Sequence, residues 1–175
     1  MLIQTFAIFT AALGAVAKPL GRPVVTDEHL FAYGKNISGL PIVRVKNGAY
    51  LMDKESSAIV APIRNVTFSC TTENRTLQTV TSGQTEQEAG TANLFGFNTT
   101  SGLAMFADLE SAGVTTQGFI FFGDMLFVEV DKKMAAKWTV RPVQIEGHSM
   151  FEVSWNSTAE DAMPIQLNTN APMHE

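Results

Sequence analysis

The stretch that decides the fold class is Gly118-Phe119-Ile120-Phe121-Phe122-Gly123-Asp124-Met125-Leu126-Phe127-Val128-Glu129-Val130. Two apolar runs flank Gly123-Asp124, a pair that suits a two-residue hairpin turn with glycine first. Alternation puts Phe119, Phe121, Leu126 and Val128 on one face, and Ile120, Phe122, Met125 and Phe127 on the other. Because both faces are apolar, we expect the first in the central core and the second under another layer, a long loop or a partner chain. An exposed aromatic binding face is the alternative.

A second hairpin is predicted upstream, in Ile42-Val43-Arg44-Val45-Lys46-Asn47-Gly48-Ala49-Tyr50-Leu51-Met52. Asn-Gly tolerates the positive φ angles of a type I′ turn. A turn centred on Asn47-Gly48 sets Val45 opposite Tyr50 and Val43 opposite Met52, which makes one apolar face. Arg44 and Lys46 fall on the other face, which we expect to be the wetter one.

The rest of the chain consists of short apolar runs broken by turn residues, which is typical of an all-β fold. In Ile63–Cys70, the side chains of Val66, Phe68 and Cys70 point one way, and those of Asn65, Thr67 and Ser69 the other. The sequence predicts a single-domain antiparallel β-sandwich of about ten to twelve short strands, with a β-trefoil or small β-barrel as alternatives. Further segments are assigned as strands at 58–61, 92–97, 103–106, 138–145, 150–155 and 164–167, a long loop at 81–91 and one helical turn at 131–136.

The N-terminus has the features of a secretory signal peptide. No ionisable side chain precedes Lys18, and the apolar run ends in Ala15-Val16-Ala17, the small-x-small pattern of a cleavage site. The run is shorter than the ~20 residues that span a bilayer. We therefore expect a signal peptide at 1–17, an extended N-terminal segment at 18–30, one β domain at 31–167 and a disordered polar tail at 168–175. The expected location is extracellular, including the cell wall.

Five Asn-x-Ser/Thr sequons support passage through a eukaryotic secretory pathway. Chance predicts roughly one or two in a chain of this composition. A glycan must point to solvent, so each acceptor also predicts a surface position. The acceptors are Asn36, Asn65, Asn74, Asn98 and Asn156.

Charge and cysteine content restrict the partners. The 175-residue chain has a net charge of −5 with both signs scattered, so it lacks the basic footprint that binding to nucleic acid or to an anionic membrane requires. Cys70 is the only cysteine. We expect it to be a buried core residue, with a reactive or intermolecular thiol as the alternative. The chain is expected to be a monomer.

No motif for catalysis, for a metal or for a cofactor stands out. His29, His148 and His174 are the only histidines, and no nucleophile motif or metal-ligand spacing accompanies them. Asp108, Glu110, Asp124 and Glu129 are nominal carboxylates for a glycosidase. Sugar binding needs only an exposed aromatic ring with polar neighbours. Trp138 and Tyr33 are the candidates, because Trp155 and Tyr50 alternate with core residues.

A resemblance adds to this interpretation. It rests on Tyr33-Gly34, Ser38-Gly39-Leu40-Pro41-Ile42, Asn47-Gly48-Ala49-Tyr50-Leu51, Asn65-Val66-Thr67-Phe68, Thr116-Gln117-Gly118-Phe119 and Trp155-Asn156-Ser157-Thr158. These segments resemble small secreted β-rich proteins of filamentous fungi and, more distantly, phialide-type cell-wall and IgE-binding-like secreted proteins. The more distant relatives usually carry several cysteines, whereas this chain has one. The resemblance implies an extracellular or cell-wall setting and supplies no catalytic residues.

The expected function is that of a secreted, N-glycosylated, non-enzymatic extracellular or cell-wall-associated protein. One form of this function is an effector-like role toward another organism. Its partners would be cell-wall polysaccharide or an extracellular protein. A carbohydrate-binding module is the alternative. A secreted enzyme with an unrecognised site is the second alternative.

Overall fold

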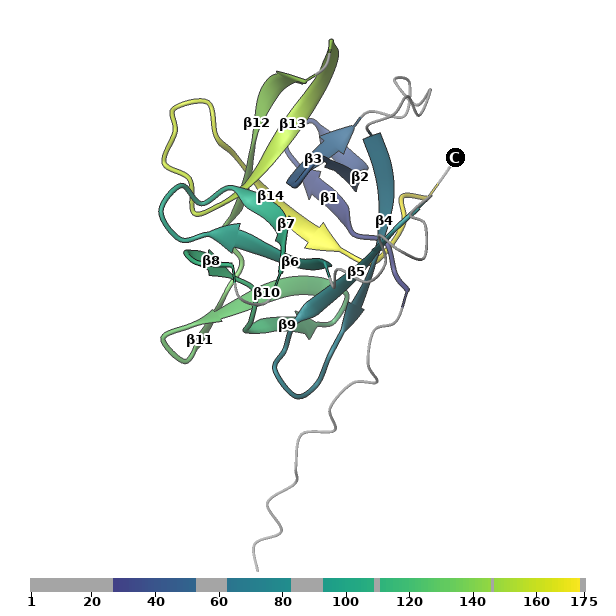
Figure 1. Cartoon of the computed structure of the whole chain (residues 1–175). Helices are drawn as coiled ribbons and strands as arrows, with labels where there is room; N and C mark the ends of the chain where they lie inside the picture. The colour runs from purple at the N-terminus through teal and green to yellow at the C-terminus, as the bar shows by residue number, and fades with distance from the viewer. Residues whose placement is uncertain (1–26, 53–62, 83–92, 109–110, 146, 174–175) are drawn as a thin grey trace, which may run out of the picture.

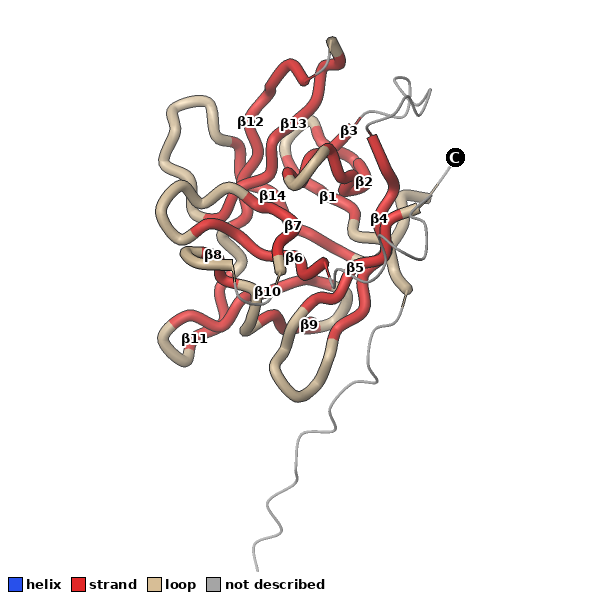
Figure 2. The backbone as a smooth tube through the Cα atoms, viewed as in Figure 1, coloured by secondary structure: helices blue, strands red, loops and turns tan. Residues whose placement is uncertain are grey.

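Every regular element of the described chain is a β-strand (Figure 2). The structure is a computed structural model, and it describes residues 27–52, 63–82, 93–108, 111–145 and 147–173. The all-β prediction is confirmed. The described strands are β1 (Phe31–Gly34), β2 (Ile37–Val45), β3 (Gly48–Met52), β4 (Ile63–Cys70), β5 (Leu77–Thr81), β6 (Asn93–Asn98), β7 (Ala104–Ala107), β8 (Val114–Thr115), β9 (Phe119–Phe122), β10 (Met125–Val130), β11 (Lys133–Ala135), β12 (Trp138–Ile145), β13 (His148–Trp155) and β14 (Met163–Asn168).

The strand pairings close on themselves, which makes the sheet barrel-like (Figure 1). From β1, antiparallel pairings run through β2, β3, β13, β12 and β14 and return to β1. A second circuit runs from β2 through β4, β5, β6, β7 and β3 back to β2. Two separate stacked sheets contain no such circuits. The small barrel, one of the two expected alternatives, therefore describes the strand pairing better than the sandwich does.

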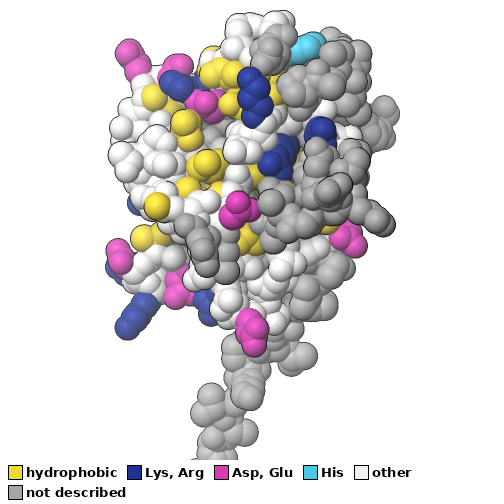
Figure 3. Space-filling model, in the orientation of Figure 1, with side chains coloured by type: hydrophobic (Ala, Val, Ile, Leu, Met, Phe, Trp, Pro, Cys, Tyr) yellow, Lys and Arg dark blue, Asp and Glu magenta, His cyan; other side chains and the backbone are white. Residues whose placement is uncertain are grey.

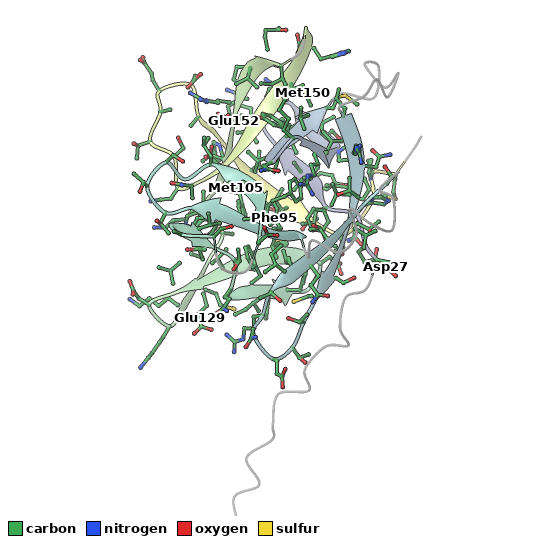
Figure 4. The ribbon with its side chains drawn as sticks, viewed as in Figure 1. Asp27, Phe95, Met105, Glu129, Met150 and Glu152 are labelled. Atoms are coloured by element: carbon green, nitrogen blue, oxygen red, sulfur yellow. The ribbon has the colours of Figure 1, made fainter. Side chains whose placement is uncertain are left out.

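The main core fills the inside of this barrel around Phe95, which lies near the centre of Figure 4. The Phe95 ring lies 5.6 Å from Phe68, 5.9 Å from Phe106 and 5.7 Å from Trp138, between ring centroids. A second cluster lies on the opposite face of β2, β3, β4 and β13. Its buried members are Val43, Val45, Met52, Ile63 and Met150.

The β2–β3 hairpin differs from its prediction in two ways. Val45 pairs with Gly48 and Val43 with Tyr50, so the turn is centred on Lys46-Asn47 rather than on Asn47-Gly48. Gly48 is instead a strand residue, and a Cβ there would lie 2.5 Å from the Tyr50 ring. The face expected to be wetter is part of the main core, where Ile42, Ala49 and Leu51 are buried. Only Lys46, in the turn, is exposed as expected.

Arg44 belongs to that inward face and lies at its end. Its guanidinium carbon lies 5.1 Å from the centroid of the Phe106 ring. Nε donates to the carbonyl of Lys46 at 2.6 Å, and Nη2 donates to Asn47 Oδ1 at 3.1 Å. Burial, and then the charge of Arg64 directly across on β4, lower the pKa of Arg44. The Arg44 guanidinium thus lies over a core ring and also stabilises the turn through its hydrogen bonds.

The β9–β10 hairpin has the predicted register and turn, with Leu126 opposite Phe121 and Val128 opposite Phe119. Phe119, Leu126 and Val128 are buried in the main core, with Phe121 packed against them. On the other face, the described residues leave Phe122 63% exposed, so they supply no full covering layer there, and cover by a partner chain stays a prediction. Ile120, Met125 and Phe127 on that face are half-buried.

Other segments also differ from expectation. Residues 131–136 hold no helical turn: they contain β11, which pairs with β10. β14 extends to Asn168, and the expected disordered tail beyond it makes contacts, since Tyr33 donates to the carbonyl of Asn170 at 2.8 Å. Residues 1–26, with the expected signal peptide, lie outside the described residues, as do the expected strand at 58–61 and most of the expected loop at 81–91.

Candidate functional site

A cleft of about 580 Å³ lies where the turn after β6 meets the segment after β13. Residues 97–102 form one wall and residues 155–159 another, while Thr115 and the end of β10 (128–130) complete it. β6 pairs with β7 and β8, and β13 pairs with β12 and β3, so the cleft walls come from two segments that lie far apart in the sequence.

The first wall is a turn built by one asparagine and one glycine. Asn98 Oδ1 accepts hydrogen bonds from the backbone N–H groups of Thr100 at 2.9 Å and Ser101 at 2.8 Å. Such local bonding by an asparagine side chain favours a tight turn. Gly102 follows with φ of 75°, and a Cβ there would lie 2.4 Å from the Trp155 carbonyl oxygen. The Trp155 N–H donates to the Gly102 carbonyl at 2.7 Å, which fixes the two walls relative to each other.

The floor of the cleft is aromatic. Phe97 and Trp155 stack with their ring centroids 5.2 Å apart and their planes inclined by 21°. Trp138 packs edge-on against Trp155 from the core side, at 4.9 Å. Trp155 is 9% exposed, so only a small part of this stack is open to a ligand in the cleft.

The rest of the lining is mainly amide and hydroxyl groups, which come from Asn98, Thr99, Thr100, Ser101, Thr115, Asn156, Ser157 and Thr158. Glu129 is the one carboxylate among the described lining residues, and it forms an ion pair with Arg75. The cleft therefore offers many neutral hydrogen-bonding groups and little uncompensated charge.

A smaller cavity of about 270 Å³ lies on the other side of the same turn, and Asn98 and Ser101 line both. Glu152 and Met105, labelled in Figure 4, line it together with Tyr50. The Glu152 carboxylate accepts from Arg141 at 2.7 Å. Burial, and then the negative charge of Glu152, raise the pKa of Tyr50, so its hydroxyl is a neutral hydrogen-bonding group here.

The structure brings two of the five predicted glycan acceptors together. Asn98 and Asn156 both line the larger cleft, Asn98 half-buried and Asn156 exposed. Asn36, Asn65 and Asn74 are exposed at other places, in the β1–β2 turn, on β4 and in the β4–β5 turn. The outward direction expected for Asn65 agrees with the burial of Val66 and Phe68.

The two predicted ligand-contact aromatics lie elsewhere. Trp138 is 1% exposed, and its indole N–H donates to the Leu126 carbonyl at 3.3 Å, so it is a core residue and offers no platform. Tyr33 is half-buried on β1, away from the cleft lining. Trp155, taken as core from its alternation, is the tryptophan that borders the cleft.

The remaining candidate groups do not converge on the cleft. Cys70 is half-buried against the main core, and its thiol lies 3.8 Å from the Thr71 carbonyl. Glu129 lines the cleft, whereas Asp124 precedes the other end of β10 and is absent from the lining. In the described ranges, no group of three or more His, Cys, Asp or Glu residues could hold a metal ion. That part of the chain also contains no helix of the length and hydrophobicity needed to cross a membrane.

Comparison of the chain with models of known protein families, with curated proteins and with solved structures found no match. Its function must therefore be inferred from its own residues.

Sequence reasoning missed the cleft itself. Two signals were present: a sequon directly after a strand, at Asn98 and again at Asn156, and the Ser101-Gly102-Leu103 turn. Neither motif carries information about the other. The Leu103–Ser154 bridge that brings them together is a long-range contact.

Proposed function

We propose that this chain is a secreted, N-glycosylated, non-enzymatic protein that binds a neutral carbohydrate in the cleft between residues 98–102 and 155–159. The observation that carries the proposal is the lining: amide and hydroxyl side chains above an aromatic floor, with one carboxylate already ion-paired. Sugar hydroxyls need donors and acceptors in fixed positions, and their apolar C–H faces pack against aromatic groups.

Size and charge support a neutral ligand of a few sugar units. A volume of about 580 Å³ lies within the range of roughly 300–1,000 Å³ that is usual for ligand pockets. The net charge of −5 disfavours acidic polysaccharides. Charged side chains of both signs are scattered over the face shown in Figure 3 and form no single basic patch there.

The proposed setting is the cell exterior or the cell wall, where neutral polysaccharides are abundant. The apolar segment at 1–17 and the five sequons support this location. The proposed partner is accordingly a cell-wall polysaccharide, bound by a monomer.

The carboxylates favour binding over hydrolysis. Glycosidases use a pair of carboxylic groups across one cleft. Glu129 lines the larger cleft and Glu152 the smaller cavity, with the turn of Asn98 and Ser101 between them. Each forms an ion pair with an arginine, Arg75 or Arg141, so neither carboxylate stands unpaired in its cavity.

The test is titration of the unglycosylated mature chain, made in a bacterial host, with chitotetraose, laminaritetraose and mannotriose. Thr115→Val removes one hydroxyl from the cleft without changing its shape, and it should weaken binding about 3- to 10-fold, the effect of one lost hydrogen bond. Thr67→Val on β4, outside the lining, is the matched control and should bind as the parent does. Absence of binding to all three sugars, or equal binding by Thr115→Val, would refute the proposal.

A further inference from the structure

Two complete sequons, rather than two isolated asparagines, line the cleft. Asn98-Thr99-Thr100 lies on one wall and Asn156-Ser157-Thr158 on another. The other three acceptors, Asn36, Asn65 and Asn74, are absent from the lining of both described cavities. Any glycan on Asn98 or Asn156 would therefore start within the cleft proposed above for a foreign sugar.

Asn98 is the acceptor whose geometry ties its glycan to the cleft. Its side-chain oxygen accepts the bonds from Thr100 N and Ser101 N. Those bonds do not use the amide nitrogen, which is the atom that carries an N-linked glycan. The residue is half-buried, whereas Asn36 and Asn156 are exposed. A sugar on Asn98 therefore begins between the walls, beside the amide and hydroxyl groups that line them.

We propose that N-glycosylation of Asn98 closes the cleft, because the first sugars of the attached glycan occupy it. In this modification the Asn98 amide nitrogen bonds to C1 of the first N-acetylglucosamine of a lipid-pyrophosphate donor; the lipid pyrophosphate leaves and the amide loses one proton. In the chain glycosylated at Asn98, the cleft is filled by the chain's own glycan. In the chain unmodified at Asn98, the cleft is open to an external sugar.

That glycosylation of Asn98 blocks an external sugar rests on the proposed function. That the Asn98 glycan occupies the cleft does not. The lining that suits a neutral oligosaccharide equally suits the neutral N-acetylglucosamine units that begin an N-glycan. A tethered sugar has a high effective concentration, so it excludes a free competitor even when its contacts are modest.

Site-resolved trimming of the native protein tests occupation without any ligand. Protein from a yeast host is treated with an endoglycosidase that cuts between the first two N-acetylglucosamines, and each sequon is followed by peptide mass spectrometry. We expect the Asn98 glycan to be cut at least ~10-fold more slowly than the Asn36 glycan, with equal rates after denaturation. Equal rates in the native protein, or an unmodified Asn98 beside a modified Asn36, would overturn the proposal.

A pair of variants tests closure. Thr100→Ala removes the sequon but keeps the Asn98 side chain and the Thr100 backbone N–H to which it bonds, while Thr100→Ser keeps the sequon. Both are made in a Thr158→Ala background, which removes the Asn156 sequon. Thr100→Ala also removes a lining hydroxyl, so the same pair is made in a bacterial host to measure that loss. We expect the affinity of Thr100→Ala for chitotetraose, relative to Thr100→Ser, to be at least ~10-fold higher in yeast-made than in bacterial protein.

The controls separate the two proposals. Ser38→Ala removes the Asn36 sequon and should leave chitotetraose binding unchanged. If the bacterial protein binds chitotetraose and the affinity of Thr100→Ala relative to Thr100→Ser is the same in both hosts, closure is wrong and the proposed function stands. If neither variant nor the bacterial protein binds any of the three sugars, the proposed function is wrong, and the trimming rates alone decide whether the Asn98 glycan occupies the cleft.

Discussion

The two strongest hairpins of this chain, β2–β3 and β9–β10, exchange the roles that their sequences predict. β2–β3 carries an arginine within its strands, yet both of its faces are covered: Leu51 lies in the main core and Met52 in the second cluster. β9–β10 is apolar on both faces, yet Phe122 is 63% exposed.

The difference lies in the neighbours of each hairpin. β2 and β3 pair with β1, β4, β7 and β13, so the hairpin lies in the middle of the closed sheet. β9 pairs only with β10 among the described strands and lies off the main pairing order. Alternation in a strand decides which side chains share a face, whereas the neighbours decide whether that face meets solvent.

The largest expected effect contrasts the two faces of β9–β10. Phe119→Ala should lower the free energy of unfolding by about 3–5 kcal/mol, since its ring is fully buried and packs against Phe95 and Trp138. Phe122→Ala should change it by only about 0.5 kcal/mol, as for an exposed side chain. Urea denaturation midpoints at constant m value measure both. Similar losses would mean that the outer face is covered in solution.

The next effect concerns the two faces of β2–β3, which should respond alike. Leu51→Ala in the main core and Met150→Ala in the second cluster should each cost about 2–5 kcal/mol, the range for truncating a buried aliphatic side chain. Met150 is chosen because it pairs with Met52 across β13 and β3. A loss below about 0.5 kcal/mol for Met150→Ala would show that the second cluster is open to water, and the contrast between the hairpins would disappear.

Arg44 gives a smaller effect with a clear internal control. Arg44→Ala should cost about 2 kcal/mol, because it removes the half-buried side chain whose guanidinium lies over the Phe106 ring. Arg44→Met keeps an apolar stem and removes a charge that is partly desolvated and opposite Arg64, so it should change stability by about 1 kcal/mol or less. If Arg44→Ala and Arg44→Met lose equal stability, the charged guanidinium of Arg44 matters for stability and its aliphatic stem does not.

The smallest effect is a pH dependence at Cys70, which reports on the inner face of β4. Burial raises the pKa of its thiol, against a smaller opposite effect of the Arg75 charge. The contribution of the neutral Cys70 thiol to the stability of the folded chain is therefore complete below the unfolded-state pKa of about 8.5. That contribution is lost as the pH rises through the pKa of the folded state. At pH 8 a thiol reagent should label the native protein ~10-fold more slowly than the urea-unfolded protein. Equal rates would place the thiol on the surface.

Much of the fold follows from local patterns. In β2–β3, the sets of side chains that share a face are as predicted, although the strand register and the exposure of one face are not. Val43 lies opposite Tyr50, two residues from the expected partner Met52. A shift of two residues preserves faces because the side-chain period of a strand is two. The short strand β11 was missed since three exposed or half-exposed residues, Lys133–Ala135, carry no apolar alternation.

The candidate site was predicted only in its parts. Sequon spacing marks Asn98 and Asn156 as acceptors, but their common cleft depends on the bridge between Leu103 and Ser154. Trp155 is a core residue, as its alternation predicts, and it also lines the cleft, whereas Trp138 is buried and does not line it. Trp138 pairs with Trp155 across β12–β13, and the turn at Gly102 contacts the backbone of Trp155, a contact that no local pattern predicts.

The pairing of β1 with β14, in which Ala32 lies opposite Leu167, has a consequence for the order of folding in time. A chain still being synthesised has made β1 long before β14 exists, so the barrel cannot close until almost the whole described chain is available. Folds dominated by such distant contacts form slowly. Until the six residues of β14 dock, the edges of β1 and β12 remain unpaired on one side and open to other chains. The last strand therefore completes the barrel and also ends the period in which the chain is prone to aggregate.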